Sequence, residues 1–112
     1  MNDLNSVVVD FIESAINDGI AQEEGNANQS NKCYRRIEKR IKWLTEHGEL
    51  GNAMFLELLN HRDDYVKYHT ACALLHEKED MAIDTLKVIS EKKGILGFSA
   101  KMTISEYKKG HI

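Results

Sequence analysis

The 112-residue sequence contains no proline and almost no sign of β-strands. Without proline, nothing in the chain forbids long helices. The only run of β-branched residues, positions 7–9, lies inside a helical pattern of apolar residues. No apolar stretch approaches the roughly 20 residues that span a bilayer, and no basic segment leads into an apolar run as in a signal peptide. We therefore expect an all-α protein in the cytoplasm, with no membrane segment.

The sequence also lacks a glycine-rich phosphate loop, an HExxH motif and a GxSxG motif. Cys33 and Cys72 are far apart and form no CxxC pair, which is typical of reduced thiols in a cytosolic protein. The paired acids at positions 63–64 and 79–80 stand where helices are expected to begin, and they complement the helix dipole there. We therefore predict no enzymatic activity, no cofactor and no metal site.

Apolar residues recur at spacings of three and four along most of the chain, which predicts about six helices. A chain of this length with this pattern is expected to fold as one domain, 1–112. Asn2 or Asp3 can cap the first helix, whereas the polar segment 25–31 gives little reason for order. The predicted helices cover residues 2–24, 30–47, 50–60, 64–77, 80–92 and 97–108.

Connections of two to eight residues make successive helices antiparallel neighbours. The predicted fold is therefore a set of antiparallel helical hairpins. Residues 1–48 would form an N-terminal helical pair that acts as a cap. Residues 49–78 would form a first hairpin, and residues 79–110 would form a second one of similar size.

The charges are distributed unevenly between the first two predicted helices. Residues 1–31 contain six acids and no lysine or arginine, whereas residues 32–42 contain six bases and one acid. If the two helices are neighbours, these charges pair along their shared edge, at ~0–1 kcal/mol for each exposed pair. Two functional interpretations remain open. The acidic helix could meet a basic protein partner, or the basic helix could bind nucleic-acid phosphates through Arg35, Arg36, Lys39, Arg40 and Lys42.

One side of the helix predicted at 64–77 carries an unusual set of side chains. Val66, Thr70, Ala73 and Leu74 fall on one side of this helix, and the tyrosines, histidines and cysteine fall on the other. A single helix rarely closes a zinc site, and no oxyanion-hole loop supports a cysteine nucleophile with a histidine base. The set either packs against helices 30–47 or 97–108 as a semi-polar layer, or forms an exposed interaction surface. The predicted partner-binding residues are Asp64, Tyr65, Tyr68, His69, Cys72 and His76.

The segment that includes this helix resembles a HEAT repeat, in which two helices pack as a hairpin. The resemblance rests on an apolar pair, an acid in the turn, a valine with a basic residue opening the second helix, and small residues after it. The proline common in the turn is absent, and threonine stands where alanine is commoner. The matching positions are Leu58, Leu59, Asp63, Val66, Lys67, Thr70, Ala71, Ala73 and Leu74.

Over about residues 5–108, the chain also resembles a small bacterial HEAT-like family known only as a domain of unknown function. Proteins of this type are similar to immunity proteins of bacterial toxin systems, including contact-dependent growth inhibition. This resemblance implies a HEAT-like α–α superhelix and a small acidic protein that blocks a partner. Besides the hairpin, it rests on His61, Ala82, Leu86, Ile89 and Ala100.

The sequence therefore favours a non-enzymatic protein-binding module, most specifically an immunity protein that covers the active site of a cognate toxin such as a nuclease. Such a protein is expected to act as a monomer in a one-to-one heterodimer. The alternatives are a HEAT-type adaptor without a toxin partner and, less favoured, a nucleic-acid-binding module built on residues 32–42. Both the acidic first helix and the tyrosine and histidine face of the fourth remain candidate interfaces.

Overall fold

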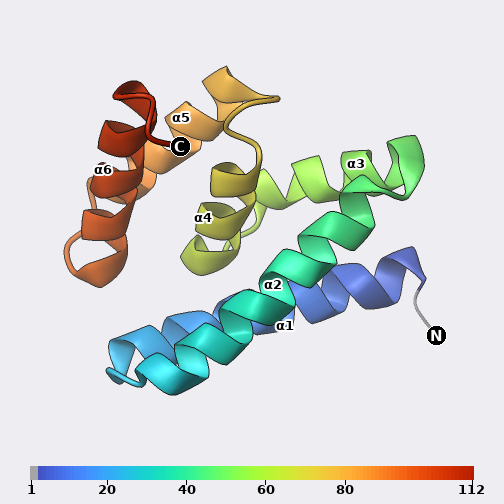
Figure 1. The fold of residues 1–112 in the computed structure, drawn as a ribbon, viewed down its shortest axis with the longest axis horizontal. Helices are drawn as coiled ribbons and strands as arrows, with labels where there is room; N and C mark the ends of the chain where they lie inside the picture. Colours follow the sequence, from blue (N-terminus) through green and yellow to red (C-terminus); the bar gives the residue numbers. More distant parts are fainter. Residues whose placement is uncertain (1–2) are drawn as a thin grey trace.

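A computed structural model describes residues 3–112, and within them the chain is all helical, without a strand. The all-α prediction, with antiparallel helical hairpins, is confirmed (Figure 1). The C-terminus lies beside α5 (Figure 1). The elements are α1 (Leu4–Glu23), α2 (Ala27–Thr45), α3 (Gly48–Glu57), the 3₁₀ turn η1 (Leu58–Asn60), α4 (Asp64–Ala73), α5 (Glu79–Ser90) and α6 (Ile95–Lys108).

The first two helices, α1 and α2, lie side by side and run antiparallel (Figure 1). Asp3 caps α1 by accepting a hydrogen bond from the amide of Ser6 at 2.8 Å, while Asn2 lies outside the described residues. Asp10 accepts hydrogen bonds from Arg36, at 2.9 Å, and from Arg40. The predicted pairing of charges between these helices is therefore confirmed at Asp10, the one acid of α1 that pairs with these bases within residues 3–112.

The turn between α1 and α2 is shorter than the sequence suggests, and the prediction of an irregular segment 25–31 is wrong. Helix α2 begins at Ala27, directly after Asn26. The side chain of Asn26 accepts a hydrogen bond from the amide of Gln29 at 3.1 Å, which caps the new helix. Gly25 has a φ of 70°, a conformation that glycine adopts without strain, so the chain reverses within very few residues.

The chain around α4 also departs from the predicted boundaries. Helix α4 packs against η1 rather than along the body of α3. It begins at Asp64 because Asp63 accepts hydrogen bonds from the amides of Tyr65 and Val66. It ends four residues before the predicted position 77. The two residues that follow its end, Leu74 and Leu75, are both buried.

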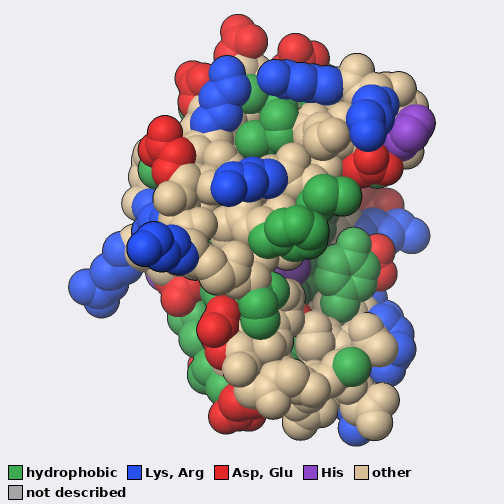
Figure 2. Space-filling model, turned by 90° about the vertical axis from the view of Figure 1, so that its left-hand side faces the viewer, with side chains coloured by type: hydrophobic (Ala, Val, Ile, Leu, Met, Phe, Trp, Pro, Cys, Tyr) green, Lys and Arg blue, Asp and Glu red, His purple; other side chains and the backbone are tan. Residues whose placement is uncertain are grey.

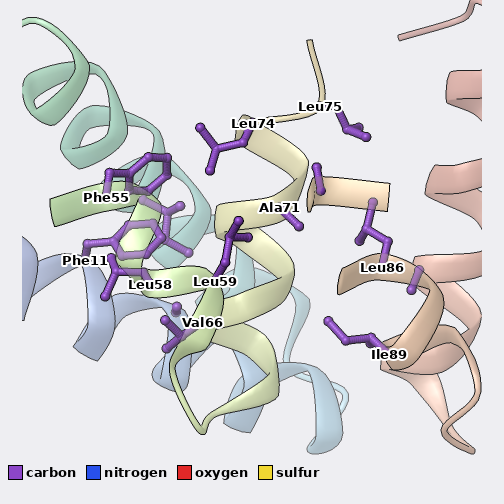
Figure 3. Packing of buried hydrophobic residues seen from close by; sticks show 14 of the residues in the cluster. Phe11, Phe55, Leu58, Leu59, Val66, Ala71, Leu74, Leu75, Leu86 and Ile89 are labelled. Atoms are coloured by element: carbon purple, nitrogen blue, oxygen red, sulfur yellow. The ribbon is translucent and has the colours of Figure 1, made fainter. Parts of the chain in front are cut away.

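Helix α4 lies in the middle of one continuous apolar core (Figure 3). On one side, Phe11 and Phe55 meet edge to face, with ring centroids 5.4 Å apart. On the other side, Leu86 and Ile89 of α5 approach α4 at Ala71. The core therefore joins the α1–α2 hairpin to the α5–α6 hairpin through α4, so α4 has neighbours on several sides.

Candidate functional site

A surface groove of about 530 Å³ runs between α2 and α4. Its α2 wall carries apolar and polar residues, whereas its α4 wall carries three of the predicted partner-binding residues. One end of the groove is visible in Figure 2 as a hollow with hydrophobic side chains around it, above the α1–α2 turn and below α6. The lining residues are Tyr34, Ile37, Glu38, Ile41, Lys42, Thr45, Tyr68, His69, Cys72 and Ala73.

The base of the groove contains a buried carboxylate–imidazole pair. The Nε2 atom of His69 lies 2.8 Å from a carboxylate oxygen of Asp18 on α1. Asp18 also accepts hydrogen bonds from the hydroxyl of Ser30 at 2.5 Å and from the side-chain amide of Gln22 at 2.8 Å. Asp18 is 1% exposed and His69 is 6% exposed. The pair therefore fixes the position of the imidazole against a fully bonded carboxylate.

The charge of this carboxylate decides which imidazole nitrogen carries a proton. Burial alone would raise the pKa of Asp18, but the hydrogen bonds from His69, Ser30 and Gln22 outweigh it and hold the pKa below its ordinary value. An ionised carboxylate only accepts hydrogen bonds, so Nε2 of His69 must be the donor. In the neutral imidazole, the other nitrogen, Nδ1, is then an acceptor.

This acceptor nitrogen reaches the surface of the groove. Nδ1 of His69 makes no hydrogen bond to another residue in the described part of the chain, 3–112. Yet no buried side-chain nitrogen or oxygen in that part lacks a hydrogen-bond partner. Nδ1 must therefore retain accessible surface, and His69 lines the groove. With a neutral imidazole, the groove consequently offers a hydrogen-bond acceptor whose orientation is set by Asp18.

Aromatic rings flank the imidazole. The ring of Tyr34, a residue that is 51% exposed, lies 6.2 Å from His69 between centroids. The ring of Tyr68 lies 5.4 Å from His69, and its hydroxyl meets the hydroxyl of Thr103 on α6 at 3.0 Å. Burial raises the pKa of the Cys72 thiol to about 11. The thiol is therefore almost entirely protonated at neutral pH and is a poor nucleophile.

The other predicted partner-binding residues on or near α4 lie outside the groove. Tyr65 packs over Gly19 and donates a hydrogen bond to Glu23 at 3.0 Å, an interaction that together with burial raises its pKa. Asp64 is paired with Lys92 at 2.5 Å. His76 is exposed and its ring lies 5.4 Å from that of Tyr107 on α6.

The six predicted residues are therefore divided among four places, and only Tyr68, His69 and Cys72 share the groove. Ala73, grouped in sequence with the buried Val66 and Thr70, is exposed and lines the groove too. Nowhere in residues 3–112 do three histidine, cysteine, aspartate or glutamate side chains gather as a possible metal site. The side chains of His69, Cys72 and His76, although aligned along the helix, thus do not gather around a common point.

The sequence pattern alone does not identify two residues of this site, Asp18 and Tyr34. Asp18 lies seven residues after Phe11 and three after Ala15, so it occupies the buried side of α1. A charged residue at such a position signals a buried partner, because isolated buried charges are costly. The spacing of apolar residues places Tyr34 on the apolar side of its helix. Nothing in the sequence indicates that its ring stays half exposed beside His69.

No model of a known protein family, no curated protein and no solved structure matches this chain. None of the helices in residues 3–112 is both long enough and apolar enough to cross a membrane. A function for this chain must therefore be inferred from the geometry and chemistry of its groove.

Proposed function

We propose that this chain is a non-catalytic protein-binding module and that its α2–α4 groove holds a side chain of a protein partner. The single observation that carries this proposal is the groove itself, with the half-exposed ring of Tyr34 on one wall and the oriented imidazole of His69 at its base. Exposed tyrosines beside a desolvated pocket are typical anchors of protein interfaces.

The chemistry of the groove favours binding over catalysis. Its thiol is held protonated by burial at Cys72. The imidazole of His69 is hydrogen-bonded to Asp18 on one side and, in its neutral form, presents an acceptor on the other. A nucleophile and a general base need to lie within hydrogen-bond reach of one another. No hydrogen bond joins Cys72 to His69 in the described residues.

The partner group that suits this groove is a basic side chain. Glu38 on α2 adds a negative charge, the face of Tyr34 attracts a cation, and Nδ1 of the neutral His69 imidazole accepts a hydrogen bond. Lys42 also lines the groove, one turn further along α2, so the cation would lie toward the Glu38 end. The net charge of −3 favours the approach of a basic partner surface over longer distances.

The most specific form of the proposal is an immunity protein, in keeping with the HEAT-like resemblance of the sequence. A toxin that acts on nucleic acid has a basic active-site cleft, since its substrate is a polyanion. A lysine or arginine from such a cleft, inserted in the α2–α4 groove, would be withdrawn from its substrate. The protein would then act as a monomer that covers the toxin in a one-to-one heterodimer.

The experiment identifies whether the gene immediately upstream encodes a toxin domain, mixes this protein with that domain and measures both binding and toxin activity. Three variants test the groove. Tyr34→Ala removes the aromatic anchor, Ala73→Arg places a bulky cation at the exposed mouth, and Leu50→Ala changes a 62% exposed residue on α3 as a matched control. We expect Tyr34→Ala to weaken binding about 30-fold or more, as interface anchors do. Leu50→Ala should weaken it by less than about twofold.

Each result separates one part of the proposal from another. Absence of a complex, with toxin activity undiminished, would rule out the immunity role. A complex that forms without loss of toxin activity would favour an adaptor without a toxin target. A tight complex unaffected by Tyr34→Ala and by Ala73→Arg would place the interface elsewhere on the molecule.

A further inference from the structure

A second hollow, separate from the groove, lies between α1 and α2 on the opposite side of α2. Its volume is about 340 Å³, at the lower end of the ~300–1,000 Å³ typical of small-molecule pockets. None of its lining residues is acidic, although the protein as a whole is acidic. The lining residues are Ser14, Asn17, Gln29, Lys32, Cys33, Arg35, Arg36 and Lys39.

The positive charges around this hollow are only partly neutralised. Within residues 3–112, Lys32, Arg35 and Lys39 take part in no ion pair. Arg36 is paired with Asp10 through Nη2, which leaves its other donors free. Four bases from three turns of one helix therefore concentrate positive potential over a small, neutral polar surface. A bound anion would relieve their mutual repulsion.

Ser14 provides an independent sign of a ligand. This residue is 3% exposed, yet its hydroxyl makes no hydrogen bond to another described residue. Other helical hydroxyls in this protein, those of Thr70, Thr85 and Thr103, bond to the carbonyl four residues earlier. Because no buried side-chain oxygen of the described residues is left unsatisfied, the Ser14 hydroxyl must open into the hollow that it lines. It is a neutral hydrogen-bonding group in the lining of the hollow that also contains the bases.

We propose that this hollow binds the phosphate groups of a small, multiply charged ligand such as a diphosphate. Arginine offers a fork of donors that matches phosphate oxygens, lysine adds a point charge, and a buried hydroxyl adds a neutral donor. The proposal does not depend on the protein-binding function of the α2–α4 groove. It also differs from nucleic-acid binding along the whole basic helix, since Arg40 pairs with Asp10 and Lys42 lines the other groove.

The probe is inorganic pyrophosphate, titrated calorimetrically into the full chain at about 20 mM and about 200 mM salt. A parallel titration with a nucleoside triphosphate separates recognition of phosphate alone from recognition of an attached nucleoside. Arg35→Ala and Ser14→Ala remove one charged and one neutral donor, and each should weaken pyrophosphate binding about tenfold. Lys87→Ala removes an exposed lysine of α5, far from the hollow in sequence, and should leave binding within about twofold.

The loss caused by Ser14→Ala is the decisive result, because this substitution changes no charge. Equal affinity for pyrophosphate and the triphosphate supports a phosphate-only site, and tighter triphosphate binding supports the same site with an added nucleoside contact. Absence of binding at low salt overturns the proposal. An equal loss in Lys87→Ala and Arg35→Ala also overturns it, since diffuse charge would then explain the binding. A competition experiment adds one more outcome. An oligonucleotide that binds to the chain and is not displaced by pyrophosphate would also overturn the proposal.

Discussion

Removal of the Asp18 carboxylate should be far more destabilising than removal of any surface acid of this protein. Asp18→Ala leaves Nε2 of His69 and the hydroxyl of Ser30 without their partner, at a site where Asp18 is 1% exposed. Loss of one member of a buried pair typically costs about 3–5 kcal/mol. A domain of this size has a free energy of unfolding of about 5–15 kcal/mol. The variant should therefore lose about a fifth or more of its stability.

The matched control lies two turns earlier on the same helix. Asp10 also accepts hydrogen bonds from two basic side chains, Arg36 and Arg40, but its own side chain is 22% exposed. Exposed pairs contribute ~0–1 kcal/mol each, so Asp10→Ala should cost about 1 kcal/mol. Urea denaturation followed by circular dichroism gives both free energies of unfolding. A loss for Asp18→Ala no greater than that for Asp10→Ala would refute the assignment of a buried, fully bonded carboxylate.

The pH dependence provides a second readout of the same pair. The pKa of Asp18 is lower in the folded chain than its ordinary value of 3.8, despite burial, because of the hydrogen bonds from His69, Ser30 and Gln22. The ionised carboxylate therefore stabilises the fold fully above pH 3.8 and loses this contribution as the pH falls through the folded-state pKa. The difference in stability between wild type and Asp18→Ala should narrow in acid, as the pH falls below 3.8. A difference that widens in acid would contradict the direction of the shift.

Three further predictions test packing and reactivity. Gly97→Ala should destabilise the protein more than Gly19→Ala in urea denaturation. The new Cβ would lie 1.8 Å from the backbone carbonyl oxygen of Lys92 in the first variant and 2.5 Å from the movable ring of Tyr65 in the second. The reverse order would show that the backbone at Lys92 moves more easily than the Tyr65 ring. Cys72, whose pKa burial raises to about 11, should react with a thiol reagent at pH 8 only when urea unfolds the chain; rapid labelling of the native protein would contradict this. Phe55→Ala should lower the free energy of unfolding by about 3–5 kcal/mol and therefore lower the thermal midpoint strongly. Phe98→Ala, at a residue that is 65% exposed, should cost less than about 0.5 kcal/mol, and equal losses would count against the core assignment.

The sequence predicts the helices of this fold well because the determinants of each helix are local. Apolar spacing identifies α1 and α2, and the charges that pair at Asp10 are visible as an acidic and a basic block in the chain. Asp63 and the acids at 79–80 mark helix starts in the structure as they do in the sequence. These signals depend on neighbours within a turn or two, so one sequence is enough to show them.

The end of α4 and the candidate site depend on contacts between distant parts of the chain. The helix ends at Ala73, and Leu74 and Leu75, which follow it, belong to the core that α4 shares with α5. The Asp18–His69 pair spans 51 positions, so periodicity along one helix cannot reveal it. The same holds for the groove, because its two walls come from helices that are joined through α3 and η1.

The Asp18–His69 pair is both a structural link and the determinant of the groove's hydrogen-bonding character. It ties α1 to α4, and in the neutral imidazole it makes Nδ1 a hydrogen-bond acceptor toward the groove. A substitution at either residue therefore changes stability and recognition together, and weaker partner binding in such a variant would not by itself locate the interface. Tyr34 and Ala73 are exposed and carry no such link. Substitutions at these two positions can separate recognition by the groove from the stability of the fold.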